Sequence, residues 1–188
     1  ETSPDTQISL TDPDSRSMTS KGAGTGTVGY NVQSAVDPEH HLIVAHEVTN
    51  VGIDREQLSH IAQAAKDALK LDTLEVVADR GYFSGKEVMA CTQTGITATM
   101  PKPVTSPNRK KGLFIKEDFR YNAEEDVYLC PAKQKLTYRY SSEEKGMTLR
   151  RYFYSGCPNC PLYAKCTTGK ERRVTRWEHE HLLEDMQA

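Results

Sequence analysis

The sequence predicts an α/β fold: a mixed sheet with elements in the order β-β-β-α-β-α-β, followed by a small β-hairpin region rich in cysteine. Short alternating patterns joined by tight turns open the chain, and two helical patterns then each lead into an apolar strand. After residue 100 the composition changes to proline, basic residues and cysteine. We therefore expect a core at 1–100, a Cys-rich hairpin insertion at 101–169 and the start of a truncated C-terminal helix at 170–188.

The composition limits the class of protein. The chain has 188 residues, of which 37% are hydrophobic, and its mean hydropathy is -0.64, so we expect one domain or one domain with an appendage. A net charge of -2 argues against a generally basic nucleic-acid binder, although a local basic face remains open because Lys and Arg are unevenly spread. No apolar run approaches the roughly 20 residues that span a bilayer. The first residues include neither an initiator Met nor the pattern of a signal peptide, so we expect a fragment of a longer protein.

Three strands are expected at the start of the chain. Residues 28–36 and 42–49 alternate like strands and are separated by a turn. An earlier strand is expected over residues 8–12, because Pro13 pushes Asp12 towards an extended backbone. The glycine-rich stretch 20–27 is interpreted as a mobile hairpin loop. A phosphate-binding loop is disfavoured there because a strand pattern follows it and not a helix.

Two helices and two strands follow. Asp54 is expected to open the first helix, whose apolar residues recur at helical spacing from Leu58 to Leu69. Residues 74–78 read as a short buried strand that presents Asp79 at its C-terminal end, where Gly81 permits a sharp turn. Ser84 and Glu87 stand at capping-box spacing, which predicts a second helix over residues 84–94 and then a strand over 96–100.

This order of elements is typical of an RNase H-like core, in which the first and fourth strands are neighbours. The two strand ends would bring Asp12, or alternatively Asp14, beside Asp79. Carboxylates that lie this close repel each other unless a divalent cation lies between them, and Mg²⁺ takes oxygen ligands of this kind. A single strand-end Asp is as often a turn former, so the prediction depends on the pair.

The region after residue 100 predicts a linker and two hairpins. The basic, proline-punctuated stretch 101–111 is either a solvated linker or a loop that contacts phosphates. Residues 119–121 with 127–129, and 136–140 with 148–154, have the pattern of hairpins. The alternating Tyr and Arg of the second hairpin suit nucleic-acid contact, although an ordinary exposed sheet face is the commoner explanation.

Four cysteines of this region have metal-ligand spacing. Cys130, Cys157, Cys160 and Cys166 form C-x26-C-x2-C-x5-C, which suits a tetrahedral structural Zn²⁺; the alternative is four reduced thiols. An odd number of cysteines and a close pair fit a metal site in a reducing cytosol, so we expect a cytoplasmic protein, and Cys91 is interpreted as a small core residue. The tail is predicted to be helical from about Thr175, with residues 178–181 as a solvated face.

Five stretches together resemble the DDE transposases of bacterial insertion sequences. They are Thr11-Asp-Pro-Asp-Ser-Arg16, Gly29-Tyr-Asn-Val-Gln-Ser-Ala-Val-Asp37, Val48-Thr-Asn50 with Asp54, Val77-Ala-Asp-Arg-Gly-Tyr82, and the late cysteine cluster. The resemblance covers nearly the whole chain and is closest to the subgroup with a Cys-containing insertion before the final Glu. It implies an RNase H-like fold and a homodimer as the active assembly. The implied partner is DNA, both as transposon ends and as target, and no membrane is involved.

The resemblance also implies the catalytic residues. Two Mg²⁺ (or Mn²⁺) ions would be held by two Asp and one Glu, for DNA strand cleavage and strand transfer. Asp12 matches the first family Asp and Asp79 the second, while Asp14 is the less favoured candidate for the first. No residue matches the family Glu, so we expect the isolated chain to be catalytically silent or nearly so. The alternatives are a non-enzymatic zinc-stabilised nucleic-acid or protein-binding module, and a metal-dependent nuclease of the same fold.

Overall fold

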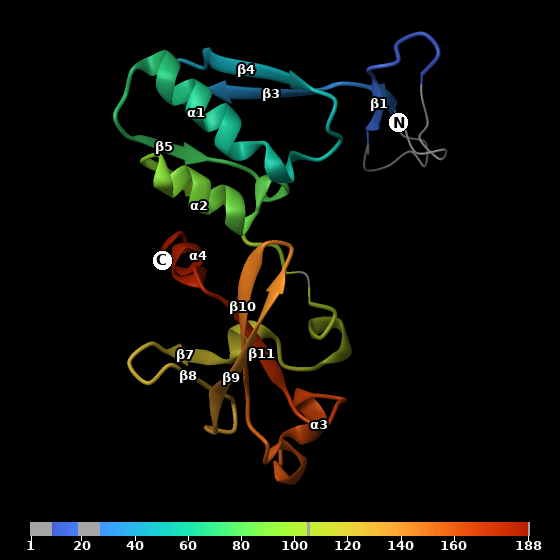
Figure 1. Ribbon diagram of the computed structural model, residues 1–188, viewed down its shortest axis with the longest axis vertical. Coiled ribbons are helices and arrows are strands. Elements are labelled where there is room, and N and C mark those ends of the chain that lie inside the picture. The colour runs from blue at the N-terminus through green and yellow to red at the C-terminus, as the bar shows by residue number, and fades with distance from the viewer. Residues whose placement is uncertain (1–8, 19–26, 105, 188) are drawn as a thin grey trace. The chain divides into compact units, whose positions relative to one another are not determined.

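The computed structural model of this chain describes residues 9–18, 27–104 and 106–187 (Figure 1). The described residues divide into two compact units. Unit 1 comprises the residues up to 103 together with those from 182 onwards, and unit 2 comprises residues 104–181.

Unit 1 is a mixed α/β unit, as the sequence predicts. Its strands are β1 (Arg16–Met18), β2 (Thr27–Gly29), β3 (Asn31–Val36), β4 (Ile43–Thr49), β5 (Leu74–Val77) and β6 (Ile96–Thr99). Its helical elements are η1 (Asp54–Glu56), α1 (Leu58–Leu69), η2 (Arg80–Tyr82) and α2 (Gly85–Gln93). The pairs β1–β2 and β3–β4 are antiparallel, whereas β5 and β6 run parallel, as expected for strands joined through a helix.

Helix α1 forms because its apolar residues recur on one side. Leu58, Ile61, Ala62 and Ala65 are all buried, and the helix packs against β3, β4 and α2. The apolar stripe predicted from the sequence is therefore confirmed over its first two turns. It does not extend to Leu69, which is exposed beside the helix end, where Lys70 adopts a left-handed backbone (φ 55°).

Helix α2 begins as predicted after Ser84, but the predicted capping box is wrong. The Ser84 side chain makes no capping hydrogen bond. Glu87 instead accepts a hydrogen bond from the backbone N–H of Ser59 at 2.8 Å, at the start of α1. The carboxylate thus satisfies a free amide of the other helix and ties α1 to α2. Cys91 of α2 is fully buried, which confirms that it is a core residue.

The start of the chain differs from the prediction. Ile8 lies outside the described residues, and residues 9–12 are not a strand: the Asp12 carbonyl accepts hydrogen bonds from the Ser15 N–H and hydroxyl, which turns the chain so that β1 starts at Arg16. The single strand expected at 28–36 is interrupted at Tyr30 and contributes to two sheets. Most of the glycine-rich stretch lies outside the described residues. Among the described strands β1 pairs with β2 and β5 with β6, so the RNase H-like neighbour relation of the first and fourth strands stays a prediction.

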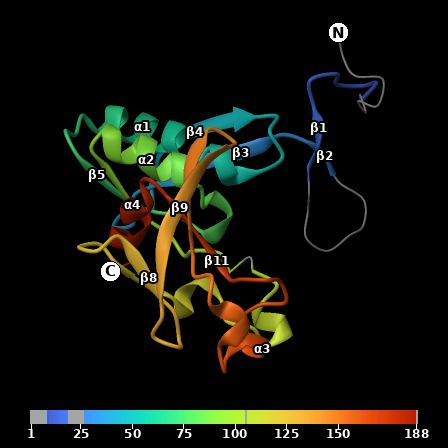
Figure 2. The same cartoon turned by 60° about the horizontal axis from the view of Figure 1, so that its bottom comes forward.

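Unit 2 is built on one antiparallel sheet of five strands in the order β11-β10-β9-β8-β7 (Figures 1 and 2). The strands are β7 (Arg120–Asn122), β8 (Val127–Leu129), β9 (Lys135–Glu144), β10 (Met147–Phe153) and β11 (Arg173–Trp177). The short helical elements are η3 (Arg109–Lys111), η4 (Lys116–Asp118), η5 (Cys157–Asn159) and α3 (Tyr163–Cys166). Both hairpins expected from the sequence are present, and strand β8 joins them into one sheet.

The core of unit 2 is aromatic, and the partly exposed carboxylate of Asp126 accepts hydrogen bonds from two of its tyrosines. Tyr152 is fully buried and donates its hydroxyl to Asp126 Oδ1 at 2.7 Å. Tyr121 donates to the same oxygen at 2.7 Å, and Arg150 pairs with Asp126 Oδ2 at 2.6 Å. Burial by itself raises the pKa of Asp126, but the hydrogen bonds from Tyr121 and Tyr152 and the Arg150 charge outweigh burial and lower the pKa below its usual value.

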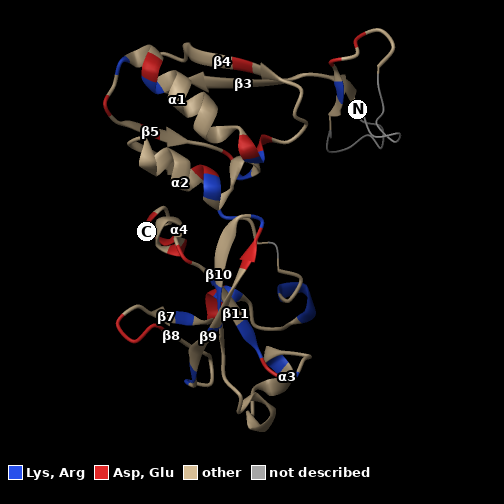
Figure 3. Cartoon of the chain, in the orientation of Figure 1, with Lys and Arg blue, Asp and Glu red and all other residues tan. Residues whose placement is uncertain are grey.

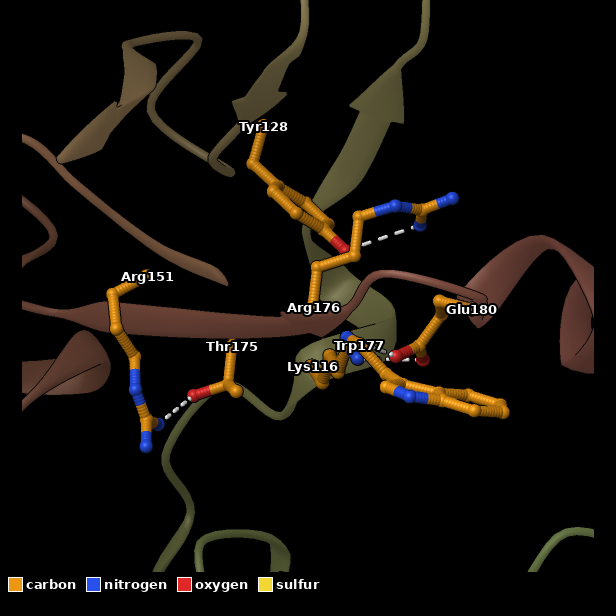
Figure 4. A network of polar contacts seen from close by, with 7 residues as sticks. All are labelled: Lys116, Tyr128, Arg151, Thr175, Arg176, Trp177 and Glu180. Carbon is orange, nitrogen blue, oxygen red and sulfur yellow. Dashed lines mark hydrogen bonds and ion pairs between the residues drawn. The ribbon is translucent and has the colours of Figure 1, made fainter. Parts of the chain in front are cut away.

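The prediction that the charged tail is helical from about Thr175 is wrong. Residues 173–177 form β11, paired with β10, because β-branched Val174 and Thr175 favour a strand and Val174 enters the core. Helix α4 (Glu180–Asp185) follows. Glu180 is 6% exposed, so the prediction of a solvated face was wrong for this residue: it forms an ion pair with Lys116 at 2.6 Å and accepts the Trp177 N–H (Figure 4).

Candidate active site

Asp79 lies where the sequence predicts it, directly after β5. Its backbone is extended (φ -75°, ψ 172°), and its side chain caps η2 by accepting the Gly81 N–H at 2.5 Å. The residue is exposed. A rigid strand followed by a tight turn therefore presents this carboxylate to solvent.

Asp54 is the acid that the structure brings next to Asp79. A methyl group added to Gly81 would lie 2.8 Å from Asp79 Oδ1 and 3.5 Å from Asp54 Oδ2, so both oxygens face the same α-carbon. Burial raises the pKa of the Tyr82 hydroxyl, and the negative charges of Asp54 and Asp79 raise it further. The two carboxylates thus share one site around η2.

From the sequence, Asp54 was expected to start a helix and belongs to one of the stretches that carry the family resemblance, but it was not predicted as a partner of Asp79. The available signal was its position: Asp54 follows β4 and Asp79 follows β5, and the single helix α1 connects these two strands. Acids placed after two strands joined by one crossover helix are candidates for the same edge of an α/β unit.

A buried amide connects Asp54 to the turn that carries Asp79. Gln33 is 1% exposed and donates Nε2 to Asp54 Oδ1 at 2.8 Å, while its Oε1 accepts the Tyr82 hydroxyl. Asn31 donates Nδ2 to the same Asp54 oxygen at 2.8 Å. Two amides therefore hold Oδ1, and Oδ2 is the oxygen that faces Gly81.

Asp12 has a different set of partners. The Tyr30 hydroxyl lies 3.1 and 3.0 Å from its two carboxylate oxygens, and the Asp14 N–H donates to Oδ1 at 3.2 Å. The hydrogen bond to Asp12 is the main reason why the pKa of Tyr30 is raised. Asp12 lines a pocket with Ser15, Gly29 and others of the β1–β2 hairpin. Its juxtaposition with Asp79 stays a prediction, as does Asp14 as the alternative.

Asp54 and Asp79 provide the type of donor atom that a divalent cation binds, but they are only two acids. Carboxylate oxygens are the ligands that Mg²⁺ prefers, and Asp54 and Asp79 supply them side by side. In the part of the chain that the structure describes, no group of three or more His, Cys, Asp or Glu side chains could hold a metal ion. The described site is thus a pair of acids and not a triad.

The four late cysteines line one pocket of unit 2. Cys130, Cys157, Cys160 and Cys166 surround it together with apolar side chains, and all four are free thiols. Burial raises the pKa of Cys166 to about 11; Arg172 opposes this and the three other thiols add to it. The four thiols line the same pocket but do not form a metal-binding group among the described residues, so the Zn²⁺ site stays a prediction.

Comparison with known families finds a match in the last third of the chain. The family model described as "Transposase DDE domain" matches residues 129–188, which begin in β8 and include all four late cysteines and α4. No curated protein and no solved structure matches the chain. No helix among the described residues is long and apolar enough to cross a membrane. The match agrees with the resemblance found from the sequence, and both Asp12 and Asp79 lie outside the matched residues.

Proposed function

Starting from the match of residues 129–188 to a transposase DDE domain, which supports a DDE transposase with DNA as its partner, we propose that this chain contributes to Mg²⁺-dependent DNA strand cleavage and strand transfer. The observation that carries the proposal is Asp79 at the C-terminal end of β5, with Asp54 beside it. Its origin in a bacterial insertion sequence is part of the same proposal.

The proposal gives each acid a role. Asp79 and Asp12 would hold Mg²⁺ or Mn²⁺. The ions would supply activation of a water or a DNA 3′-hydroxyl and stabilisation of the leaving oxygen. Gly81 holds the Asp79 carboxylate through its N–H, which fixes the direction in which the free lone pairs point. Gln33 and Asn31 hold Asp54 beside it.

The third acid is unassigned. Glu178, Glu180 and Glu184 do not match the family segment, and Glu180 is already engaged by Lys116 and the Trp177 N–H. Since two acids bind metal ions more weakly than three, we expect the isolated 188-residue chain to show little or no strand transfer.

We also propose that the four late cysteines hold a structural Zn²⁺ within unit 2. The support is their spacing in the sequence and their arrangement around one pocket. Binding of Zn²⁺ removes the thiol protons, so the metal would reverse the raised pKa of Cys166. A cytoplasmic location in bacteria fits the free thiols, and a homodimer would let one assembly hold two transposon ends.

A plasmid-nicking and strand-transfer assay tests the proposed function. The assay uses the chain together with whatever sequence flanks it in its gene, DNA carrying the ends of the element, and Mg²⁺. We expect cleavage that requires Mg²⁺ and falls to background in Asp79→Asn. Full Mg²⁺-dependent cleavage by Asp79→Asn would refute the role of Asp79. Absence of cleavage by the parent protein would refute the proposal that the protein is a DNA-cleaving enzyme.

A non-enzymatic nucleic-acid-binding module is the second candidate, because the charge of unit 2 favours it. Unit 2 carries 16 Lys and Arg against 10 Asp and Glu. The same assay separates the two candidates: a binding module retains its DNA affinity in Asp79→Asn and never cleaves, whereas a transposase retains affinity and loses cleavage.

A further inference from the structure

The sheet of unit 2 has an outer face on which two arginines stack on one phenylalanine. The guanidinium carbons of Arg139 and Arg173 lie 5.2 and 5.3 Å from the centre of the Phe153 ring. Arg139 comes from β9, Phe153 from the neighbouring β10 and Arg173 from β11 on its other side. Tyr140 is also exposed, and it is a hydrogen-bond partner of Arg173. We call these four residues the Arg–Phe face.

This face is separate from the core. Tyr152 and Val174, the neighbours of Phe153 and Arg173 along their strands, are buried in the hydrophobic cluster of the unit. Side chains alternate between the two faces of a strand, so the arginines and Phe153 lie on the opposite side of the sheet. The register of β9 and β10 shifts between Arg151 and Tyr152, which leaves Arg139 as the extra residue, and such a bulge redirects a side chain.

The charge of the whole chain conceals the charge of this unit. With 16 basic and 10 acidic residues unit 2 is positive, whereas unit 1 has 8 basic and 16 acidic residues. Figure 3 shows the basic segments of unit 2 on β7, β11 and the turn at Arg109–Lys111. A polyanion would therefore be attracted to unit 2 and repelled by unit 1.

We propose that the Arg–Phe face binds the phosphate backbone of DNA, an inference that rests on the proposed function for its choice of polyanion. An aromatic ring fixes the plane of a guanidinium and leaves its N–H edge free to bind phosphate oxygens. Arg173 donates Nε and Nη2 to Glu171 Oε1 at 3.3 and 3.0 Å, so a phosphate competes with this carboxylate at Arg173 but not at Arg139. These contacts read no base, so the face contributes affinity and orientation and not sequence preference.

The salt dependence of DNA binding by the 188-residue chain tests the proposal. Each phosphate contact contributes about 0.9 to the slope of log Kd against log salt concentration. We expect the double variant Arg139→Gln, Arg173→Gln to bind a labelled DNA duplex more weakly and to lower the slope by about two. Phe153→Leu keeps both charges and an apolar side chain, and we expect it to weaken binding because the guanidinium groups lose their platform.

A second double variant provides the matched control. Lys70→Asn, Lys133→Asn also removes two positive charges, at exposed turn positions with left-handed backbones that Asn tolerates. We expect its slope to stay close to that of the parent chain. Equal slopes for the two double variants would overturn the Arg–Phe face, as would no binding of DNA by the parent chain. The transposase proposal fails separately, when cleavage does not depend on Asp79.

Discussion

Gln33 and Asp54 are joined by a hydrogen bond of 2.8 Å from the buried Gln33 amide nitrogen to Asp54 Oδ1. The same amide accepts the hydroxyl of Tyr82, which belongs to the turn after Asp79. A side chain of β3 thus connects two segments that are far apart in the sequence, one before α1 and one after it.

Replacing Gln33 by Met tests this connection. Met has a similar length but can form neither of these hydrogen bonds. The Tyr82 hydroxyl therefore loses its acceptor, and Asp54 loses a donor. We expect the free energy of unfolding, measured in urea, to fall by about 1–3 kcal/mol. Gln63→Met is the matched control, because Gln63 also donates to an aspartate, Asp67, but on the exposed side of α1. Equal losses in the two variants would contradict a special role for Gln33.

Gly81→Ala is expected to move the Asp79 carboxylate. The added methyl group would lie 2.8 Å from Asp79 Oδ1, which is closer than real contacts of this kind, and the side chain must rotate away. Because the residue is exposed, we expect Mn²⁺ affinity measured by calorimetry to fall while the melting temperature changes little. Gly169→Ala, whose methyl group would meet no atom closer than 3.8 Å, should change neither. A melting temperature that falls with unchanged Mn²⁺ affinity would contradict this account.

Asp126 makes the stability of unit 2 depend on acid. Its pKa is lowered in the folded state, since the hydrogen bonds and Arg150 outweigh burial, so its contribution is present above the ordinary value of 3.8 and is lost as the pH falls through the lower folded value. Asn fits the left-handed backbone of Asp126 (φ 51°) but has no charge. Because solvent screens this 38% exposed side chain, we expect Asp126→Asn to lower the free energy of unfolding by only about 1 kcal/mol at neutral pH, and by less below about pH 4. If the difference in unfolding free energy between the parent and Asp126→Asn did not depend on pH, the claim that the charged form of Asp126 stabilises unit 2 would be contradicted.

Zinc content is measured by native mass spectrometry on the reduced protein. We expect one Zn²⁺ per chain, lost in Cys157→Ser or Cys160→Ser. Cys91→Ser is the control, because Cys91 is buried in α2 and its thiol, with a pKa raised to about 11 by burial and the charge of Glu87, is inert. Absence of Zn²⁺ with four reactive thiols would make unit 2 an ordinary antiparallel sheet.

The sequence predicted those parts in which local pattern and tertiary packing agree. The stripe of α1, the alternation of β4 and the strand before Asp79 each point to one structure. The prediction that this strand is buried was wrong, because none of its residues is buried and Val77 is 88% exposed. The predicted strand at residues 8–12 was wrong because it relied on the restriction imposed by Pro13, and the Asp12 carbonyl instead closes a turn with Ser15. The predicted capping box was wrong because Glu87 had a competing partner in α1.

The pairing of acids needed the fold. Asp79 could be identified from its place at a strand end, but Asp54 becomes its neighbour only after α1 folds back between β4 and β5. The Arg–Phe face depends on a register shift between β9 and β10, which no sequence pattern specifies. The buried Glu180 depends on Lys116, 64 residues away.

Titration of Mn²⁺ into the chain, followed by calorimetry, tests the central claim that Asp79 is a metal-binding carboxylate. We predict that the parent chain binds Mn²⁺ and that Asp79→Asn does not, whereas Asp67→Asn, which removes an exposed acid of α1, binds like the parent. Equal affinity in Asp79→Asn and Asp67→Asn, or no binding by the parent chain, would contradict the claim.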